Sequence, residues 1–190
     1  MSDQEIMVKA TPLQAVLDFM TANLKPEVKE KVFIKTAVEF PEETNRVRGQ
    51  KLLAFDRVPL RFTIKLVELT AEEMHEQSAD VAYRIGRLGA EAAAKGVLRL
   101  ALTMISIPSL LRKLEPVWTQ LYSHGKMSST CEAKSAVVEL KEFPLISATF
   151  CSRVTGWFAW FAEKAEKTAT VKHVSCRTRG DATCRWSIAW

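Results

Sequence analysis

The spacing of the apolar residues changes after Gly125, and this change limits the fold more than any other feature of the sequence. Before Gly125, apolar residues recur every three or four positions, as in residues 11–38 and 74–93, which predicts helices. After it, apolar and polar side chains alternate over residues 127–140, which is typical of β-strands. An amphipathic stretch over residues 150–165 then predicts one further helix.

The last residues predict a second β-hairpin. Residues 168–177 and 183–190 are strand-like and flank Arg179-Gly180-Asp181, where the glycine can supply the positive φ angle of a turn. The order of elements is therefore helices, hairpin, helix, hairpin. We expect an α+β fold in which an antiparallel sheet is backed by helices, and not a doubly wound parallel sheet.

Several local signals predict boundaries and contacts. The polar segment 40–45 is expected to be a linker, and Thr70-Ala-Glu-Glu has the form of a capping box, which predicts a long helix beginning at Thr70. Gly86 and Gly89 within that helix favour the close approach of a neighbouring helix. Trp160 is expected to lie outside the core, where it could mark an interface.

The composition is that of a globular protein. The chain has 190 residues, of which 47% are hydrophobic and 26% are charged, which excludes a disordered chain and a disulfide-dense miniprotein. The net charge of +5 includes no run of Lys and Arg of the nucleic-acid-binding type, so no nucleic-acid partner is expected.

The apolar segments predict neither a signal peptide nor a membrane span. The first residues lack a basic segment followed by an apolar one, so we expect a cytoplasmic protein. The longest apolar segment, residues 97–111, contains Arg99 and Pro108 and is shorter than the roughly 20 residues that a span needs. It is expected to be a buried helix.

Three of the four cysteines and one histidine lie close together in the sequence. The predicted hairpin places Cys176 opposite Cys184, and Cys151 lies on the core-facing side of the preceding helix. His173 can join them only if the strand carries a bulge at residues 174–175. Three cysteines and one histidine form an accepted tetrahedral zinc set. The spacing favours equally a zinc site and its alternatives, a Cys176–Cys184 disulfide or three buried thiols with a surface histidine.

The C-terminal segment resembles the signature of the 4-vinyl reductase domain family. The resemblance rests on Val174-Ser-Cys-Arg-Thr-Arg-Gly-Asp-Ala-Thr-Cys-Arg-Trp-Ser-Ile-Ala-Trp190, in which Cys, Gly-Asp, Cys and a final Trp follow one another. It is strongest over the last forty residues and extends over residues 70–150. Because residues 1–65 match no known family, we expect an N-terminal helical extension over 1–65 and a 4-vinyl-reductase-like domain over 66–190.

This resemblance implies a fold shared with haem-nitric-oxide-binding domains and with small subunits of the TRAPP vesicle-tethering complex. Proteins of this fold often enclose an apolar pocket and often form dimers. In the phenol-sensing bacterial regulators of the family, zinc is bound by a helix cysteine, an acidic residue and two hairpin cysteines. These positions carry over to Cys151, His173, Cys176 and Cys184, with a histidine in place of the carboxylate and the helix cysteine offset by one residue. The resemblance therefore implies a structural zinc.

Haem is not expected from the residues. His75 lies in a predicted helix and could be an axial ligand, but it is surrounded in sequence by Glu72, Glu73 and Glu76, which favours solvent exposure. The Tyr-x-Ser-x-Arg motif of the nitric-oxide sensors is absent from the sequence.

Together these features predict a small-molecule-binding sensor or regulatory domain of a bacterial protein, with a hydrophobic pocket and a structural zinc. We expect a small hydrophobic ligand, a homodimer and an unidentified protein partner that receives the signal. The alternative is a TRAPP-subunit-like interaction scaffold without a ligand. No enzyme is expected, because the sequence contains no Walker loop, no G-x-S-x-G and no H-E-x-x-H.

Overall fold

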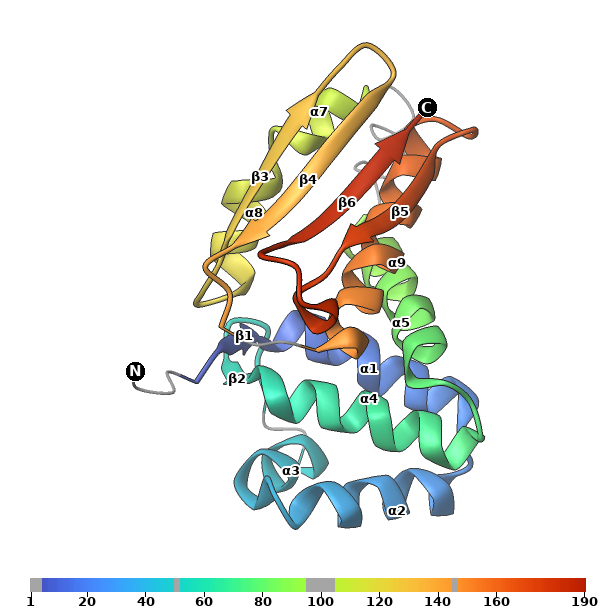
Figure 1. Cartoon of the computed structure of the whole chain (residues 1–190). Coiled ribbons are helices and arrows are strands. Elements are labelled where there is room, and N and C mark those ends of the chain that lie inside the picture. The colour runs from blue at the N-terminus through green and yellow to red at the C-terminus, as the bar shows by residue number, and fades with distance from the viewer. Residues whose placement is uncertain (1–4, 50–51, 95–104, 145–146) are drawn as a thin grey trace.

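The computed structural model describes residues 5–49, 52–94, 105–144 and 147–190 (Figure 1). The first part of the chain is mainly helical: β1 (Met7–Lys9), α1 (Ala10–Asn23), α2 (Pro26–Ala37), α3 (Pro41–Arg48), β2 (Arg57–Pro59), α4 (Leu60–Met74) and α5 (Ser78–Ala93). The second part contains two hairpins and the helices that pack on them: α7 (Ile107–Leu111), α8 (Leu114–Leu121), β3 (Lys126–Cys131), β4 (Ser135–Lys141), α9 (Ala148–Ala165), β5 (Thr170–Ser175), the short 3-10 helix η1 (Arg177–Arg179) and β6 (Cys184–Ala189).

The sheet has the order β3-β4-β6-β5, and all of its neighbouring strands are antiparallel. Alternate residues of β4 and β6 are buried, so one face of the sheet packs against helices. Helix α8 lies against β3, and α9 lies against β5 and β6 (Figure 1). The α+β fold with a helix-backed antiparallel sheet is therefore confirmed.

The predicted bulge is also present. The register between β5 and β6 shifts between His173 and Ser175, which is where a shared site with Cys176 requires it. The extra residue turns the two side chains toward the same side of the sheet.

Helices α5 and α9 approach each other closely enough for their backbones to touch. A Cβ atom added to Gly86 in α5 would overlap the carbonyl oxygen of Arg153 in α9. A Cβ atom added to Gly156 in α9 would overlap the carbonyl oxygen of Tyr83 in α5. The close approach that the glycines of the first helix favour is thus confirmed at Gly86.

Several predicted boundaries are wrong. The segment expected as a linker begins α3, where Pro41 occupies the first turn of the helix. Thr70 does not cap a helix, because α4 begins at Leu60 and the Thr70 hydroxyl donates to the carbonyl oxygen of Leu66 at 2.6 Å. Helix α4 ends at His75, which has a φ of 56°. Buried apolar side chains recur at helical spacing from Leu60 onward. The helix therefore begins before Thr70, and the capping sequence lies inside it.

Two further expectations concern buried segments. Trp160 is buried, with 4% of its surface exposed, and packs against Ala90 of α5 and Ala94 directly after it, so its expected exposure is wrong. In the buried helix expected over 97–111, residues 97–104 lie outside the described residues, and the remainder contains α7.

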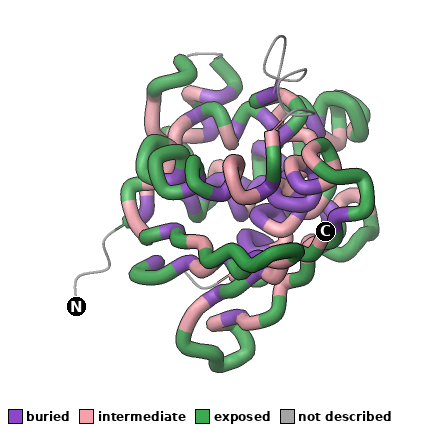
Figure 2. Tube along the Cα trace, turned by 90° about the horizontal axis from the view of Figure 1, so that it is seen from above, coloured by how far each residue is buried: buried purple, intermediate pink, exposed green. Residues whose placement is uncertain are grey.

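Buried positions concentrate in the interior of the chain trace, and exposed positions form its outer turns (Figure 2). The boundary expected after residue 65 falls within α4, and the division into an extension and a domain stays a prediction. Among the described helices, none combines the length and the apolar character that crossing a membrane requires.

We expect Gly86→Ala to lower the free energy of unfolding by about 2–4 kcal/mol, because a backbone carbonyl cannot yield as a side chain can. For a chain of this size the melting temperature should fall by about 4–16 °C. Gly89→Ala is the matched control, because its Cβ would meet only the Ala15 methyl group at 3.3 Å. A methyl group can yield by a few tenths of an ångström, and alanine is favoured over glycine in a helix by about 1 kcal/mol, so this control should lose much less stability than Gly86→Ala. Equal losses in both variants would contradict the account.

Candidate ligand cavity and cysteine cluster

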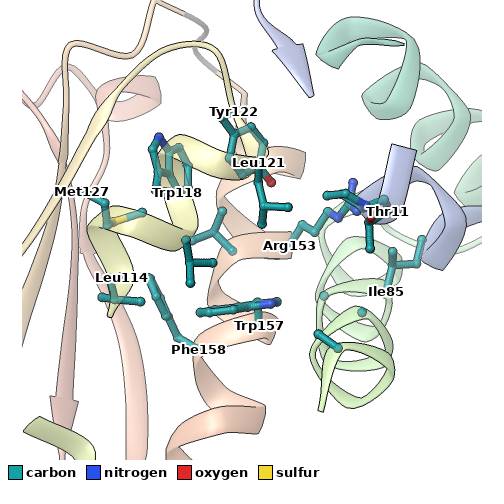
Figure 3. Close-up of a pocket in the computed structure, with 16 residues that line it drawn as sticks. Thr11, Ile85, Leu114, Trp118, Leu121, Tyr122, Met127, Arg153, Trp157 and Phe158 are labelled. Carbon is teal, nitrogen blue, oxygen red and sulfur yellow. Dashed lines mark hydrogen bonds between the residues drawn. The ribbon is translucent and has the colours of Figure 1, made fainter. Parts of the chain in front are cut away.

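A cavity of about 220 Å³ lies between α5, α8, α9, β3 and the start of α1 (Figure 3). Most of the residues that line it are apolar or lack a polar side chain: Pro12, Ile85, Gly86, Gly89, Ala93, Leu114, Val117, Trp118, Leu121, Met127, Val154, Trp157 and Phe158. Such a lining, with few polar groups, is typical of small-molecule sites.

Aromatic contacts fix one wall of the cavity. The rings of Trp118 and Tyr122 stack with centroids 4.2 Å apart, and both contact Phe143 and Phe150 edge to face. The Trp118 indole N–H donates to the carbonyl oxygen of His124 at 2.9 Å. These contacts hold the wall in place.

Arg153 brings a charge to this apolar lining. It lies on α9 with 9% of its surface exposed, and Figure 3 shows its side chain extending from α9 toward Thr11 of α1. The guanidinium donates to the carbonyl oxygen of Pro12, and burial lowers the Arg153 pKa. Among the described residues no carboxylate lies within ion-pair distance of it. Burial also raises the pKa of Tyr122, so the nearby phenol is neutral.

Arg153 was not among the residues predicted to form a site. The sequence does place Arg153 on an aromatic helix face. It lies three residues after Phe150 and four before Trp157, so it shares the face of α9 that they occupy. A lone charged residue among buried aromatic residues is an unusual feature of a helix.

The structure brings together all four residues of the predicted metal site. The sulfur of Cys151 lies 3.6 Å from that of Cys184 and 3.8 Å from that of Cys176, and the sulfurs of Cys176 and Cys184 are 4.0 Å apart. The ligand atoms of these cysteines and of His173 all lie within 4.8 Å of one another. Four-coordinate metal–thiolate bonds of about 2.3 Å separate the sulfurs by about 3.8 Å, which matches these distances.

His173 completes the cluster from β5. Its ring stacks on Trp186, with centroids 4.8 Å apart, and its buried Nε2 atom has no hydrogen-bond partner among the described residues. A buried polar atom without a partner is costly, and a ligand that binds it would remove the cost.

The loop between the two hairpin cysteines is held by its own hydrogen bonds. The Cys176 N–H donates to the Asp181 carboxylate at 2.6 Å, which lowers the pKa of Asp181, and Gly180 has a φ of 89°. Strand β5 pairs with β6 up to Ser175, which lies opposite Arg185, and Cys176 follows directly before η1. Continuing this register by one residue brings Cys176 opposite Cys184, as the sequence predicts, with their sulfurs 4.0 Å apart.

The three buried cysteines are free thiols in the structure, as is the exposed Cys131. Cys151 and Cys184 share a hydrogen bond that lowers the pKa of Cys184, while the same interaction and burial raise the pKa of Cys151. The cluster therefore favours a thiolate at Cys184, the form in which cysteine binds metal ions.

No protein-family model matches the chain, and no curated protein matches it. The structure is similar to solved H-NOX proteins over almost its whole length. An H-NOX protein from S. oneidensis in the Fe(II)NO ligation state is 15% identical, with a TM-score of 0.72 over 95% of this chain and 97% of that chain. An unliganded Fe(II) H-NOX variant from K. algicida is 14% identical, with a TM-score of 0.72 over 95% of each chain.

A third solved structure comes from work described as "Modulating Heme Redox Potential Through Protein-Induced Porphyrin Distortion". It is 9% identical, with a TM-score of 0.68 over 96% of this chain and 99% of that chain. At these identities the likeness shows a shared fold. The relationship to haem-nitric-oxide-binding domains that the sequence suggested is therefore confirmed for the fold.

This likeness corrects the cofactor expectation, which was a structural zinc with haem not expected. The solved proteins of this fold are described by H-NOX iron ligation states and by haem, so they point to haem and not to zinc. A short motif and one helical histidine are poor guides to this fold, because its likeness persists at 9–15% identity.

The cavity offers part of what a haem needs. Tyr122 and Met127 are of residue types that bind haem iron in other proteins, and the charge of Arg153 suits a propionate. No histidine or cysteine is among the described lining residues. The volume of about 220 Å³ is below the roughly 300–1,000 Å³ of sites for drug-sized ligands, so a porphyrin requires the cavity to widen.

An ion pair fastens the two helices that bound the cavity. Arg87 of α5 donates two hydrogen bonds of 2.8 Å to the carboxylate of Glu163 in α9, which lowers the Glu163 pKa below 4.5. Because the Glu163 pKa is lower in the folded than in the unfolded state, the ion pair contributes its full stability above pH 4.5. This contribution is lost as the pH falls through the folded-state pKa.

We therefore expect Glu163→Gln to lower the free energy of unfolding near pH 7 by about 0.5–1 kcal/mol, since both side chains are partly exposed and screened. Chemical denaturation near pH 7 and near pH 3 measures the effect, and the difference from wild type should shrink at the acidic pH. Glu5→Gln, at an exposed residue before β1, is the control and should change neither value. A Glu163→Gln deficit that is the same at both pH values would contradict the ion-pair account.

Proposed function

We propose that this chain is a small-molecule-binding sensor or regulatory domain, and the observation that carries the proposal is the open apolar cavity. An apolar cavity of about 150 Å³ is known to bind benzene, so about 220 Å³ accommodates a molecule with one ring and a short substituent. The rigid aromatic wall and the glycines of α5 provide a preformed surface for such a molecule.

The similarity to H-NOX proteins supports the same proposal, because those structures are described in Fe(II)NO and Fe(II)CO ligation states. The alternative of a TRAPP-like scaffold without a ligand requires a pocket filled by side chains. The cavity volume favours the sensor.

We expect toluene, as a generic apolar probe, to raise the melting temperature of the wild-type protein. At ten times its dissociation constant the gain is about 1.4 kcal/mol, or about 3–6 °C for this chain length. Hemin is titrated in parallel, with uptake followed by its visible absorbance, to test whether the cavity widens for a porphyrin.

Val117→Trp should abolish the toluene shift, because Val117 lines the cavity and is partly exposed on α8, so a larger ring can fill the space. Val137→Trp is the matched control, because Val137 is similarly exposed on β4 and is not a lining residue. The proposal fails if neither probe binds wild type, or if Val117→Trp responds as wild type does.

We propose that Cys151, His173, Cys176 and Cys184 bind one metal ion that fastens the C-terminal hairpin to α9. The sulfur separations, the unpartnered Nε2 atom and the thiolate character of Cys184 support this proposal. With four protein ligands no position remains for a water molecule, so the role is structural.

We expect about one metal ion per chain in wild type, and we expect Cys176→Ser and Cys184→Ser each to lose it. Elemental analysis of untagged protein kept under reducing conditions identifies the ion and its amount. The exposed Cys131→Ser is the matched control and should retain the metal. Removal of the ion should cost several kcal/mol of stability. A metal-free wild type, or loss of metal in Cys131→Ser, would contradict the proposal.

The remaining expectations stand as proposals. They are a homodimer, a cytoplasmic protein acting through a protein partner, and membership of the 4-vinyl reductase family. The features that motivated the dimer, Gly86 and Trp160, make contacts within the chain, so another surface would have to form it.

A further inference from the structure

Arg153 is buried in the wall of the cavity without an anionic partner among the described residues. Its guanidinium has five N–H donors, and the one acceptor that the described residues supply is the Pro12 carbonyl oxygen. Tyr122 is the titratable group whose charge would act on Arg153, and its phenol is neutral because burial raises its pKa. A neutral carbonyl does not balance the charge of the guanidinium.

An unbalanced buried charge is one of the most costly features a protein interior can contain. A ligand that supplies the opposite charge removes this cost. A guanidinium matches a carboxylate in particular, because its planar fork can donate two parallel hydrogen bonds. The rest of the lining is apolar, so the remainder of such a ligand must be hydrocarbon.

We infer that the cavity binds an apolar carboxylate, with its hydrocarbon body against the lining of α5, α8 and α9 and its carboxylate on Arg153. This inference rests on the proposed function and adds the chemical class of the ligand. The carboxylate has two sources that fit the same chemistry, a free monocarboxylic acid with one ring or the propionate of a haem.

The position of Arg153 is fixed from both ends. Its carbonyl oxygen packs against Gly86 of α5, and its guanidinium is held by Pro12 at the start of α1. The long side chain therefore loses little freedom when a ligand binds, which favours affinity.

Calorimetric titrations with benzoate, the neutral isostere benzamide, and hemin test the inference near pH 7. We expect wild type to bind benzoate at least tenfold more tightly than benzamide, since hydrogen bonds between charged groups are about twice as strong as neutral ones. Arg153→Met should weaken benzoate binding at least tenfold and leave benzamide binding within a few-fold of wild type. Arg61→Met, an exposed arginine of α4, is the matched control and should bind as wild type does.

The thermal stability of the unliganded variants provides a second measurement. If the Arg153 charge is unpaired until a ligand binds, the unliganded Arg153→Met variant should melt at or above the wild-type temperature, because an unpaired buried charge is removed. If Arg153→Met does not fold, Arg153→Lys keeps the charge but not the fork and should bind benzoate more weakly than wild type.

Each result decides the inference. Equal affinity of wild type for benzoate and benzamide overturns it and leaves the proposed function standing. Failure of benzoate, benzamide, toluene and hemin all to bind overturns both. Benzoate binding that requires Arg153 supports a free acid, and hemin binding that requires Arg153 without benzoate binding supports a propionate. A lower melting temperature of Arg153→Met with unchanged benzoate affinity shows a structural arginine and overturns the inference.

Discussion

Helices α5 and α9 touch through their backbones, because Gly86 and Gly156 lack side chains where the helices meet. One of the two carbonyl groups at this contact belongs to Arg153, so the contact that joins the helices also fixes the origin of the charged side chain among the described lining residues. The Arg87–Glu163 ion pair fastens the same two helices at a second point. Any change that separates them would displace a wall of the cavity and its charge together.

Helix α9 serves two sites. Cys151 and Arg153 are two residues apart, and two residues turn an α-helix by about 200°, so they lie on nearly opposite sides. Cys151 meets Cys176 and Cys184 at the sheet, whereas Arg153 borders the cavity. A metal ion at the cysteine cluster would therefore fix the helix from the sheet side, while a ligand would contact it from the α5 side.

The fold class, the two hairpins and the bulge beside His173 could be predicted, because each depends on local spacing. The grouping of Cys151, His173, Cys176 and Cys184 could also be predicted, because strand pairing and one helix face determine it. The burial of Trp160 could not be predicted, because it depends on tertiary packing. The start of α4 was misplaced because the capping sequence at Thr70 was given more weight than the helical spacing of the apolar residues before it. The cavity could not be predicted either, because it lies between elements that are far apart in the sequence. Its charge was visible in the sequence only as Arg153, one arginine among aromatic residues.

A crystal structure of the wild-type protein grown with saturating benzoate tests the central claim most directly, since it locates both the ligand and its charge. The account predicts a benzoate ring against the apolar lining near Trp118 and Trp157, with its carboxylate within hydrogen-bond distance of the Arg153 guanidinium. An empty cavity under those conditions, or a benzoate whose carboxylate points away from Arg153, would contradict it.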